Sequence, residues 1–332
     1  MALRILIVTA VAAEADSVAR GLTLGGPGSS EYPLPGGYRL LRHTAPTAAT
    51  PDGHPAPEPT PGPTPARAAG AGPAPAPRTD TDTDTDTDTA GVSGTSRSPE
   101  PGADRGARQE PGVPHGGAAG GGGGVDVLVG GVGPAAAAAA TATALAHAAS
   151  LGHPALGSAP PPAPYDLVVS AGIAGGFQAL APLGSVVVSD AIVSADLGAQ
   201  TPDGYLTVEE LGFGRSTHAV DRLLTRRISA VLTRGGQPHT VAPVLTVSTV
   251  TGTAERADEL ARRHPGAAAE AMEGFGVAEA AAAYGVPVVE IRAVSNAVGP
   301  RDRGAWRIGQ AMDALRHTFQ LLSHSLFVEP AP

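Results

Sequence analysis

The chain has 332 residues, no cysteine and a formal net charge of -9. All 22 of its basic residues are arginine, which excludes mechanisms that require lysine, among them the Walker-type phosphate loop and Schiff-base catalysis. The negative charge and an aromatic content of 3% argue against a nucleic-acid polymer as the partner. The lack of cysteine excludes disulfides, thiolate nucleophiles and cysteine-based zinc sites.

The first segment, Met1 to Val11, is apolar but too short to span a bilayer, and it is typical of a buried strand rather than of a signal peptide. We therefore expect a soluble cytoplasmic protein that does not contact a membrane.

Residues 44–124 form a low-complexity insert with almost no aliphatic side chains, a run of Thr-Asp repeats and a glycine tract. Such a segment cannot bury enough apolar surface to offset its ordering entropy, so we expect it to be disordered. It is either a partner-binding arm or an expanded surface loop, and the second is favoured because short strands flank it. Tyr38 to His43 and Val125 to Gly131 would pair as a hairpin whose turn the insert replaces. Residues 1–43 and 125–328 then form one domain.

Outside the insert, apolar runs rich in valine and isoleucine alternate with helical patterns. The strand candidates are residues 3–11, 125–131, 167–171, 185–193, 244–250 and 286–294. The helix candidates are residues 13–22, 134–150, 216–233, 255–264, 271–284 and 306–327. This alternation predicts an α/β fold, a single domain with a central mixed, largely parallel twisted sheet flanked by helices.

Two glycine-rich loops follow predicted strands. The first, from Gly131 through Gly133 to Ala136, matches a G-x-G-x-x-A dinucleotide pattern in form. It lacks the downstream acid that would bind a ribose, and Pro134 removes a backbone donor, so we favour a tight strand-to-helix turn that faces a ligand. The second, Ser170 to Phe177, would let the backbone approach a ligand or a neighbouring strand closely.

The ten histidines include no pair at metal-ligand spacing on a helix, and there is no G-x-S-x-G nucleophile elbow. We expect neither a metal nor a cofactor.

Four polar residues occupy positions where an apolar residue or a turn is expected. Glu14 follows the first strand, Glu273 opens an apolar helix, Arg292 interrupts the last buried strand, and Asn296 ends that strand. Each alone could be structural, as a helix-dipole partner, an ion pair or a turn residue. All four at strand ends or first helical turns favour a shared polar site.

With the glycine loops, the segments A-M-E-G-F-G-V-A (271–278) and R-A-V-S-N (292–296) resemble the nucleoside phosphorylase superfamily, and most of all its bacterial methylthioadenosine/adenosylhomocysteine nucleosidases. The segment S-N-A-V-G-P-R-D-R-G-A-W (295–306) is similar to the futalosine hydrolase family of the menaquinone pathway. The resemblance covers the whole chain except the insert.

The resemblance implies a role for each matching residue. Glu14 would activate the attacking water, Glu273 would bind the ribose hydroxyls, Met272 would pack on the sugar, and Arg292 would lie near the water. The glycine loops would contribute substrate contacts at Gly133, Ile173 and Gly175. Two departures, Ile173 in place of a serine and Ala271 in place of a glutamate, remove polar contacts and suggest a site shaped for another 5′ substituent.

On the base side, the resemblance places Thr249 and Val250 in the base pocket and puts Asn296 where adenine-releasing nucleosidases carry aspartate. An asparagine can accept from N7–H and donate to a 6-oxo group, whereas a 6-amino group would meet the amide donor with another donor. An unmet buried pairing costs about 1 to 3 kcal/mol, so hypoxanthine fits better than adenine.

We therefore expect hydrolysis of futalosine to hypoxanthine and dehypoxanthinylfutalosine, with water activated by Glu14 and the leaving base stabilised by Asn296. The alternatives are a purine nucleoside phosphorylase, a methylthioadenosine-type nucleosidase and a non-catalytic nucleoside-binding protein. The family resemblance alone implies a homodimer.

Overall fold

A mixed ten-stranded sheet organises the part of the chain that the computed structural model describes, which comprises residues 3–22, 29–44, 124–151 and 165–327. The strand order is β11-β10-β6-β12-β5-β1-β4-β3-β2, with β9 paired to β6. The strands are β1 (Arg4–Thr9), β2 (Ser29–Pro33), β3 (Arg39–Thr44), β4 (Gly124–Val129), β5 (Leu167–Gly176), β6 (Val186–Ser194), β9 (Thr217–Ala219), β10 (His239–Thr246), β11 (Ala269–Ala271) and β12 (Val288–Ala297). A separate hairpin joins β7 (Gly198–Thr201) to β8 (Gly204–Thr207).

The helices are α1 (Ala12–Gly21), α2 (Pro134–Leu151), α3 (Arg222–Arg234), α4 (Ala254–Arg263), α5 (Gly274–Ala283) and α6 (Ile308–Ser323), with 3-10 turns at Pro35–Gly37 and Arg303–Ala305. Pairing is parallel along β4-β1-β5-β12 and along β6-β10-β11, and antiparallel where β12 meets β6. The predicted α/β fold with a mixed sheet flanked by helices is confirmed, and the sheet contains as many antiparallel as parallel pairings.

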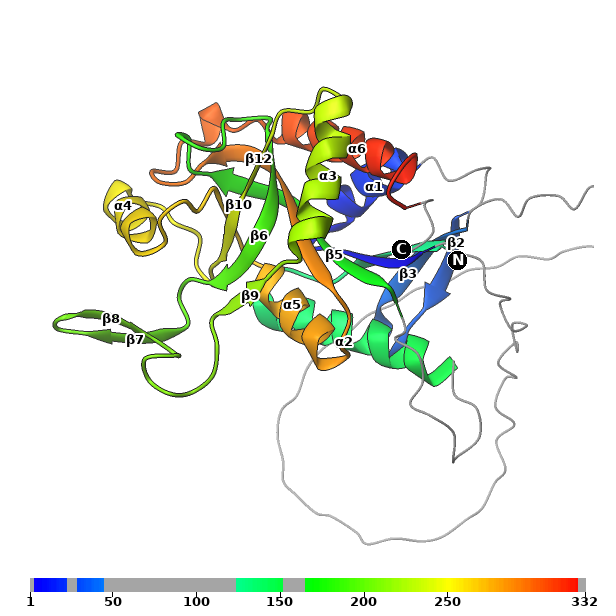
Figure 1. The fold of residues 1–332 in the computed structure, drawn as a ribbon, viewed down its shortest axis with the longest axis horizontal. Coiled ribbons are helices and arrows are strands. Elements are labelled where there is room, and N and C mark those ends of the chain that lie inside the picture. Colours follow the sequence, from blue (N-terminus) through cyan, green and yellow to red (C-terminus); the bar gives the residue numbers. More distant parts are fainter. Residues whose placement is uncertain (1–2, 23–28, 45–123, 152–164, 328–332) are drawn as a thin grey trace, which may run out of the picture. The chain divides into compact units, whose positions relative to one another are not determined.

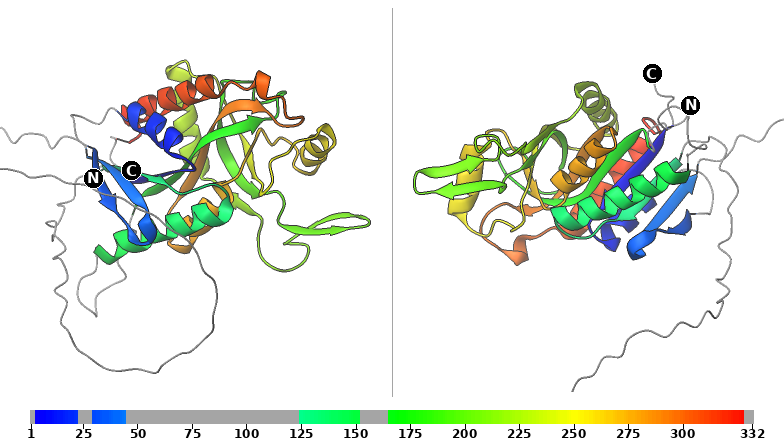
Figure 2. Two further views of the ribbon diagram at one scale, coloured as in Figure 1. Left: turned by 180° about the vertical axis from the view of Figure 1, so that it is seen from behind. Right: turned by 90° about the horizontal axis from the view of Figure 1, so that it is seen from below.

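Both faces of the sheet are covered because the strands are apolar on both sides. Ile5 and Ile7 of β1 belong to a core cluster with α1, α3 and α6, whereas Leu6 and Val8 belong to a cluster with α2 and α5. In Figures 1 and 2, α1 and α6 lie side by side over one face, and α2 and α5 over the other. This three-layer packing explains why the central strands are unbroken Val/Ile runs instead of alternating patterns.

Most predicted elements differ from the observed ones by a few residues at their ends, and in three of them part of the segment has another secondary structure. The predicted strand 244–250 ends at Thr246, so Thr249 and Val250 lie in the loop after β10. The predicted helix 216–233 begins only at Arg222, because residues 217–219 pair with β6 as β9. The predicted helix 271–284 begins at Gly274, because residues 269–271 form β11 between β10 and β5. In the last two cases, pairing with distant strands overrides the local helical pattern.

The hairpin predicted around the insert is present. β3 and β4 pair antiparallel from Leu40 opposite Leu128 to Thr44 opposite Gly124. Residues 45–123 lie outside the described residues, and the assignment of residues 1–43 and 125–328 to one domain stays a prediction.

Candidate active site

Glu14 lies in the first turn of α1, directly after β1, and is 3% exposed. Its Oε2 accepts hydrogen bonds from the backbone N–H groups of Ala10 (3.0 Å) and Val11 (3.3 Å). Its Oε1 accepts from the N–H of Ile173 in β5 at 2.8 Å. The carboxylate is therefore fixed by three backbone donors from two elements that are distant in sequence, next to the positive end of a helix dipole.

Arg292, in the middle of β12, is 1% exposed and lies among carboxylates. Its Nε donates to Glu290 at 2.8 Å, and its Nη2 lies 3.1 Å from Glu273 Oε2 and 3.2 Å from the Ser170 hydroxyl. Burial by itself would lower the pKa of Arg292, but attraction to Glu290, Glu273 and Glu14 raises it. The guanidinium is a permanent buried cation that holds the surrounding acids in place.

Glu273 immediately precedes α5 and connects two parts of the site. Its Oε1 accepts from the backbone N–H of Gly133 at 3.1 Å, while its Oε2 faces Arg292. Gly133 has a φ of 91°, a conformation that favours glycine, so the predicted turn after β4 is what aims this N–H at Glu273.

Gly172 in β5 provides the space in which these groups meet. A Cβ at this position would lie 2.5 Å from Glu14 Oε1 and 2.6 Å from Arg292 Nη1. Such distances are far below van der Waals contact, so any side chain here would displace both groups. Glu14 and Arg292 therefore meet over a position that only glycine can occupy.

Asn296 lies near the end of β12, half-buried, with its amide oriented by neighbours. The Ser295 hydroxyl donates to its Oδ1 at 2.8 Å, and its Nδ2 donates to the Ala297 carbonyl at 2.9 Å. Each amide atom keeps one further hydrogen-bonding position, an acceptor on oxygen and a donor on nitrogen. Both can serve a ligand at once.

Gly175 of β5 pairs with Asn296, and a Cβ on it would lie 3.2 Å from Asn296 Nδ2. The loop after β10 is anchored by two acids, since Asp196 accepts from the N–H of Ser248 and Glu270 accepts from Thr251. Thr249 and Val250, between these anchors, are exposed.

Direct contacts thus link five of the residues singled out in the sequence, namely Glu14, Ile173, Arg292, Glu273 and Gly133. Asn296 and Gly175 form a second group on adjoining strands. Thr249, Val250 and the half-buried Met272 lie on the segments that follow β10 and β11, without hydrogen bonds from their side chains.

Sequence reasoning missed Glu290, which is fully buried and two residues before Arg292 in the same strand. Burial raises the pKa of Glu290, and its attraction to Arg292 opposes that rise. The spacing in the sequence could have indicated this ion pair, because an acid and a base at positions i and i+2 of a buried strand share one face of the sheet.

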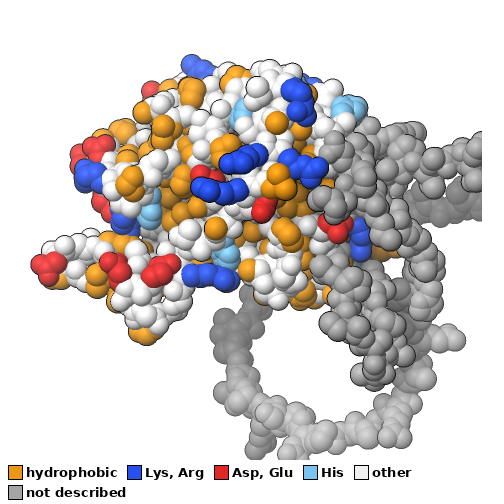
Figure 3. Space-filling view, viewed as in Figure 1, with side chains coloured by type: hydrophobic (Ala, Val, Ile, Leu, Met, Phe, Trp, Pro, Cys, Tyr) orange, Lys and Arg blue, Asp and Glu red, His pale blue; other side chains and the backbone are white. Residues whose placement is uncertain are grey.

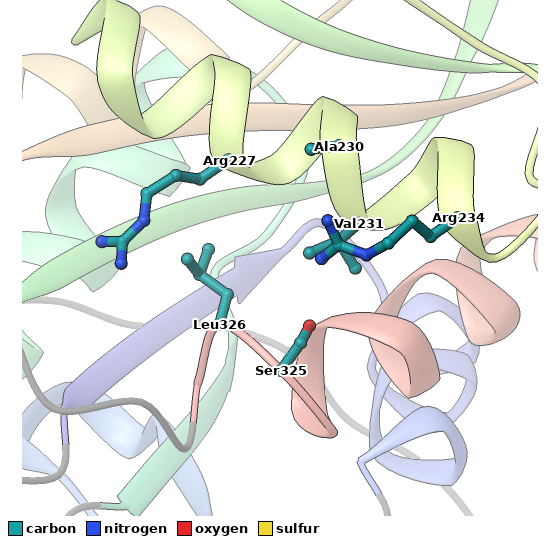
Figure 4. A pocket seen from close by; sticks show the side chains of 6 residues that line it. All are labelled: Arg227, Ala230, Val231, Arg234, Ser325 and Leu326. Atoms are coloured by element: carbon teal, nitrogen blue, oxygen red, sulfur yellow. The ribbon is translucent and has the colours of Figure 1, made fainter.

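Two surface pockets lie outside this constellation. One, of about 190 Å³, lies between α3 and the segment after α6, where Arg227 and Arg234 extend from the helix toward Ser325 and Leu326 (Figure 4). The other, of about 530 Å³, is bounded by Leu197, Phe213, Arg215, Phe275 and Glu279. Phe275 belongs to the first turn of α5, so the second pocket adjoins the helix that begins at Glu273.

Comparison with known proteins identifies the family of the chain. A family model described as the phosphorylase superfamily matches residues 113–326. A futalosine hydrolase from Streptomyces coelicolor is 62% identical over 190 residues, which is 57% of this chain and 74% of that protein. A futalosine hydrolase from Thermus thermophilus is 35% identical over 159 residues, 48% of this chain and 70% of that protein.

Solved structures show the same fold. The native futalosine hydrolase of Helicobacter pylori strain 26695 aligns with a TM-score of 0.60 at 13% identity, covering 98% of this chain and 99% of that one. The S-adenosylhomocysteine nucleosidase of Streptococcus pyogenes, in complex with 5-methylthiotubericidin, aligns with a TM-score of 0.60 at 14% identity over 98% of each chain.

The chain therefore belongs to the phosphorylase superfamily and is an N-glycosyl hydrolase. Within this superfamily it belongs to the futalosine hydrolase family, on the strength of its identity to the Streptomyces coelicolor and Thermus thermophilus proteins. No helix within the described ranges is long and apolar enough to cross a membrane. The same ranges contain no cluster of three or more His, Asp or Glu side chains that could hold a metal ion.

Proposed function

We propose that the enzyme hydrolyses the N-ribosidic bond of futalosine and releases hypoxanthine and dehypoxanthinylfutalosine, a step of menaquinone biosynthesis. The observation that carries the proposal is the meeting of Glu14 and Arg292 over Gly172, with Glu273 bound to the same arginine. The 62% identity to a futalosine hydrolase supports the choice of substrate.

In this proposal Glu14 is the general base. A carboxylate offers about four acceptor sites, and backbone N–H groups occupy three of those of Glu14. A water molecule can therefore donate to the one that remains. As the water oxygen bonds to C1′ and the C1′–N9 bond breaks, the water proton passes to Glu14 and the electron pair leaves with the purine.

Glu273 and Met272 form the ribose side of the proposed site. Glu273 is positioned by Gly133 and Arg292, so it can accept from ribose hydroxyls without moving, and Met272 can pack on the sugar. Rigid placement of this kind reduces the entropy that must be lost to reach the transition state.

Asn296 stabilises the leaving base by hydrogen bonding, because an amide does not release a proton at neutral pH. Its free acceptor position suits N7–H, protonated from solvent, and its free donor position suits the 6-oxo group. This arrangement favours hypoxanthine over adenine.

The charges around Arg292 favour water over phosphate as the nucleophile. Glu14, Glu273 and Glu290 all interact with this one guanidinium. A phosphate anion entering beside them would meet more negative than positive groups at short range, which is repulsive in a buried site. Hydrolysis is thus better supported than phosphorolysis.

The test is to incubate the purified chain with futalosine, with and without inorganic phosphate, and to quantify hypoxanthine and the sugar product by chromatography. We expect hypoxanthine at the same rate in both cases, with a free sugar hydroxyl in the product. A folded protein that releases no base refutes the proposal, and a strict need for phosphate with a sugar 1-phosphate as product identifies a phosphorylase.

Glu14→Gln separates catalysis from binding, since glutamine keeps the size of the side chain but cannot take up the proton. Turnover should fall at least about 100-fold while the affinity for nucleoside changes little. An equal loss of turnover and of nucleoside affinity in the variant would count against the role of Glu14. If neither the wild type nor the variant turns over futalosine but both bind nucleoside, the chain is a non-catalytic nucleoside-binding protein.

We further propose a cytoplasmic homodimer. Apolar side chains are exposed on both sides of the β7–β8 hairpin, with Leu197 before it 42% exposed and Phe213 after it 83% exposed. Figure 3 shows apolar and acidic groups on this projecting segment, while basic groups gather over α3. Exposed apolar area of this kind suits a second copy of the chain. Sedimentation of the wild type and of Phe213→Ser tests the dimer, and fractionation of cells tests the location.

A further inference from the structure

The proposed function leaves one donor of the leaving base without a partner. Hypoxanthine carries a hydrogen on N1, whereas N1 of adenine is an acceptor. Asn296 can form hydrogen bonds with N7–H and with the 6-oxo group, but it leaves N1–H without an acceptor. An N–H left unpaired in a buried slot costs about 1 to 3 kcal/mol, so a selective site should supply an acceptor for N1–H.

Glu270 of β11 lies on the same part of the sheet as Asn296. Both residues pair with Gly175 of β5, Glu270 from the antiparallel side and Asn296 from the parallel side. Directly paired residues project to the same face of a sheet, and neighbouring strands are about 4.8 Å apart. The two side chains therefore flank a glycine position at a separation of roughly 10 Å. Val298 also lies over this position, since a Cβ on Gly175 would lie 3.0 Å from Val298 Cγ2.

The packing of the neighbouring residues supports this orientation. Ala269 and Ala271 are buried in a core cluster with Ala174 and Val294, on the opposite face. A Cβ on Gly175 would lie 3.2 Å from Asn296 Nδ2, so the Asn296 amide lies over the same face of this glycine as Val298. Gly175 itself is partly exposed. A flat base that packs on the apolar Val298 side chain would have Glu270 on one side and Asn296 on the other.

Glu270 is 4% exposed, and its hydrogen-bond partner is Thr251. The Thr251 N–H donates to Oε1 at 2.9 Å and the Thr251 hydroxyl donates to Oε2. Among the described residues no basic side chain forms an ion pair with it, in contrast to Glu273 and Glu290. Burial raises the pKa of Glu270, and the two bonds from Thr251 oppose that rise.

A buried carboxyl group without an ion pair is costly, and the attraction between Glu270 and Arg256 acts without a direct contact. Two of the roughly four acceptor positions of Glu270 are unused. Thr251 follows Val250, which the family resemblance places in the base pocket, so the loop that Glu270 anchors is the loop expected to contact the base.

We propose that Glu270 is a specificity-determining residue that accepts the N1–H of the 6-oxopurine, with Thr251 orienting its carboxyl group. Asn296 and Glu270 then read two different edges of one base, N7 with the 6-oxo group and N1. The inference rests on the proposed function, because it assigns this part of the site to the leaving base.

The experiment compares binding of hypoxanthine, 1-methylhypoxanthine and adenine to wild type, Glu270→Leu and Glu270→Gln by calorimetry. Wild type should bind hypoxanthine about 5- to 150-fold more tightly than 1-methylhypoxanthine, which lacks the N1 hydrogen. Leucine, which has a similar volume and no acceptor, should reduce this ratio at least about 5-fold. Glutamine, which can donate to N1 of adenine, should reduce the preference for hypoxanthine over adenine. Glu255→Gln, an exposed acid on α4, is the matched control and should leave both ratios unchanged.

A structural role predicts something different. If Glu270 only anchors Thr251, both variants weaken all three bases equally and the ratios stay constant, which overturns the inference. Wild type that binds 1-methylhypoxanthine as well as hypoxanthine also overturns it, whether or not the variants fold. Release of hypoxanthine from futalosine by the wild type, measured in parallel, tests the proposed function separately.

Discussion

Asn296→Asp should change which purine the enzyme releases. In the structure Asn296 Nδ2 donates to the Ala297 carbonyl at 2.9 Å, and Oδ1 accepts from Ser295. An aspartate oxygen in the place of Nδ2 would face that carbonyl with no hydrogen between the two acceptors. The contact favours the protonated acid, whose single hydrogen then bonds to the carbonyl. No donor remains for a 6-oxo group, while the carboxyl oxygens can still accept from a 6-amino group.

The size of the effect follows from the pairings that change. A 6-oxo group loses its donor, which costs about 1 to 3 kcal/mol and lowers kcat/KM for futalosine about 5- to 150-fold. With the 6-amino analogue of futalosine, the clash between the 6-amino donor and the amide donor of Asn296 is replaced by a hydrogen bond to the new carboxyl group. The gain in free energy is of similar size. Even at the lower end, the ratio of the two kcat/KM values should shift about 25-fold toward the amino substrate.

The assay is release of hypoxanthine and of adenine from the two substrates, quantified by chromatography over a range of concentrations. Asn296→Ala is the control, because it removes donor and acceptor together and should lower both rates without reversing the preference. An unchanged ratio in Asn296→Asp, in a protein with unchanged melting temperature, would refute the reasoning that Asn296 reads the 6-position.

Three further predictions concern the scaffold of the site. Gly172→Ala should lower kcat at least about 100-fold by displacing Glu14 and Arg292, while Gly309→Ala, where the new Cβ meets nothing within 4 Å, should be neutral; equal activity of the two variants would contradict the crowding over Gly172. Glu290→Gln should alter the pH dependence of stability. Because the pKa of Glu290 is raised in the folded protein, the free energy of unfolding falls as pH rises above the ordinary value of 4.5. Urea unfolding should therefore show the wild type losing stability relative to the variant from about pH 5 upward. Parallel stability curves for the two proteins would contradict this role of Glu290. Replacing residues 45–123 by Asn-Gly should leave turnover within about 2-fold, because Thr44 and Gly124 are directly paired and a two-residue turn can join them; loss of soluble, active enzyme would show that the insert is needed.

The sequence predicted the central layers of the fold well, because buried parallel strands produce unbroken apolar runs. The strands at Leu167 and Val288 and the helix at Pro134 were found within a few residues of their observed bounds. The short strands were not found. β9 and β11 have three residues each, and they exist because they pair with β6, β5 and β10, which are distant in sequence.

The candidate site was predictable where a polar residue interrupts an apolar pattern. Arg292 and Glu273 stood out for that reason, and the structure joins them at 3.1 Å. Glu290 was missed although it interrupts the same strand, and Glu270 was missed because the segment around it looked like the start of a helix. Recognising Glu270 required knowing that it pairs with Gly175, which local sequence does not encode.

In the proposed site, the side that holds the water is buried and fixed, whereas the loop that contacts the base is exposed. Glu14 and Arg292 are buried and fixed by contacts within the protein, so the water side is organised before any ligand arrives. Thr249 and Val250 are exposed on a loop whose anchors are Ser248 and Thr251. Covering their side chains with a base restricts their motion, and that entropy must be lost on binding. Substitutions in the loop should therefore raise KM more than they lower kcat, whereas substitutions around Arg292 should lower kcat, because the first set acts on forming the complex and the second on the reacting atoms.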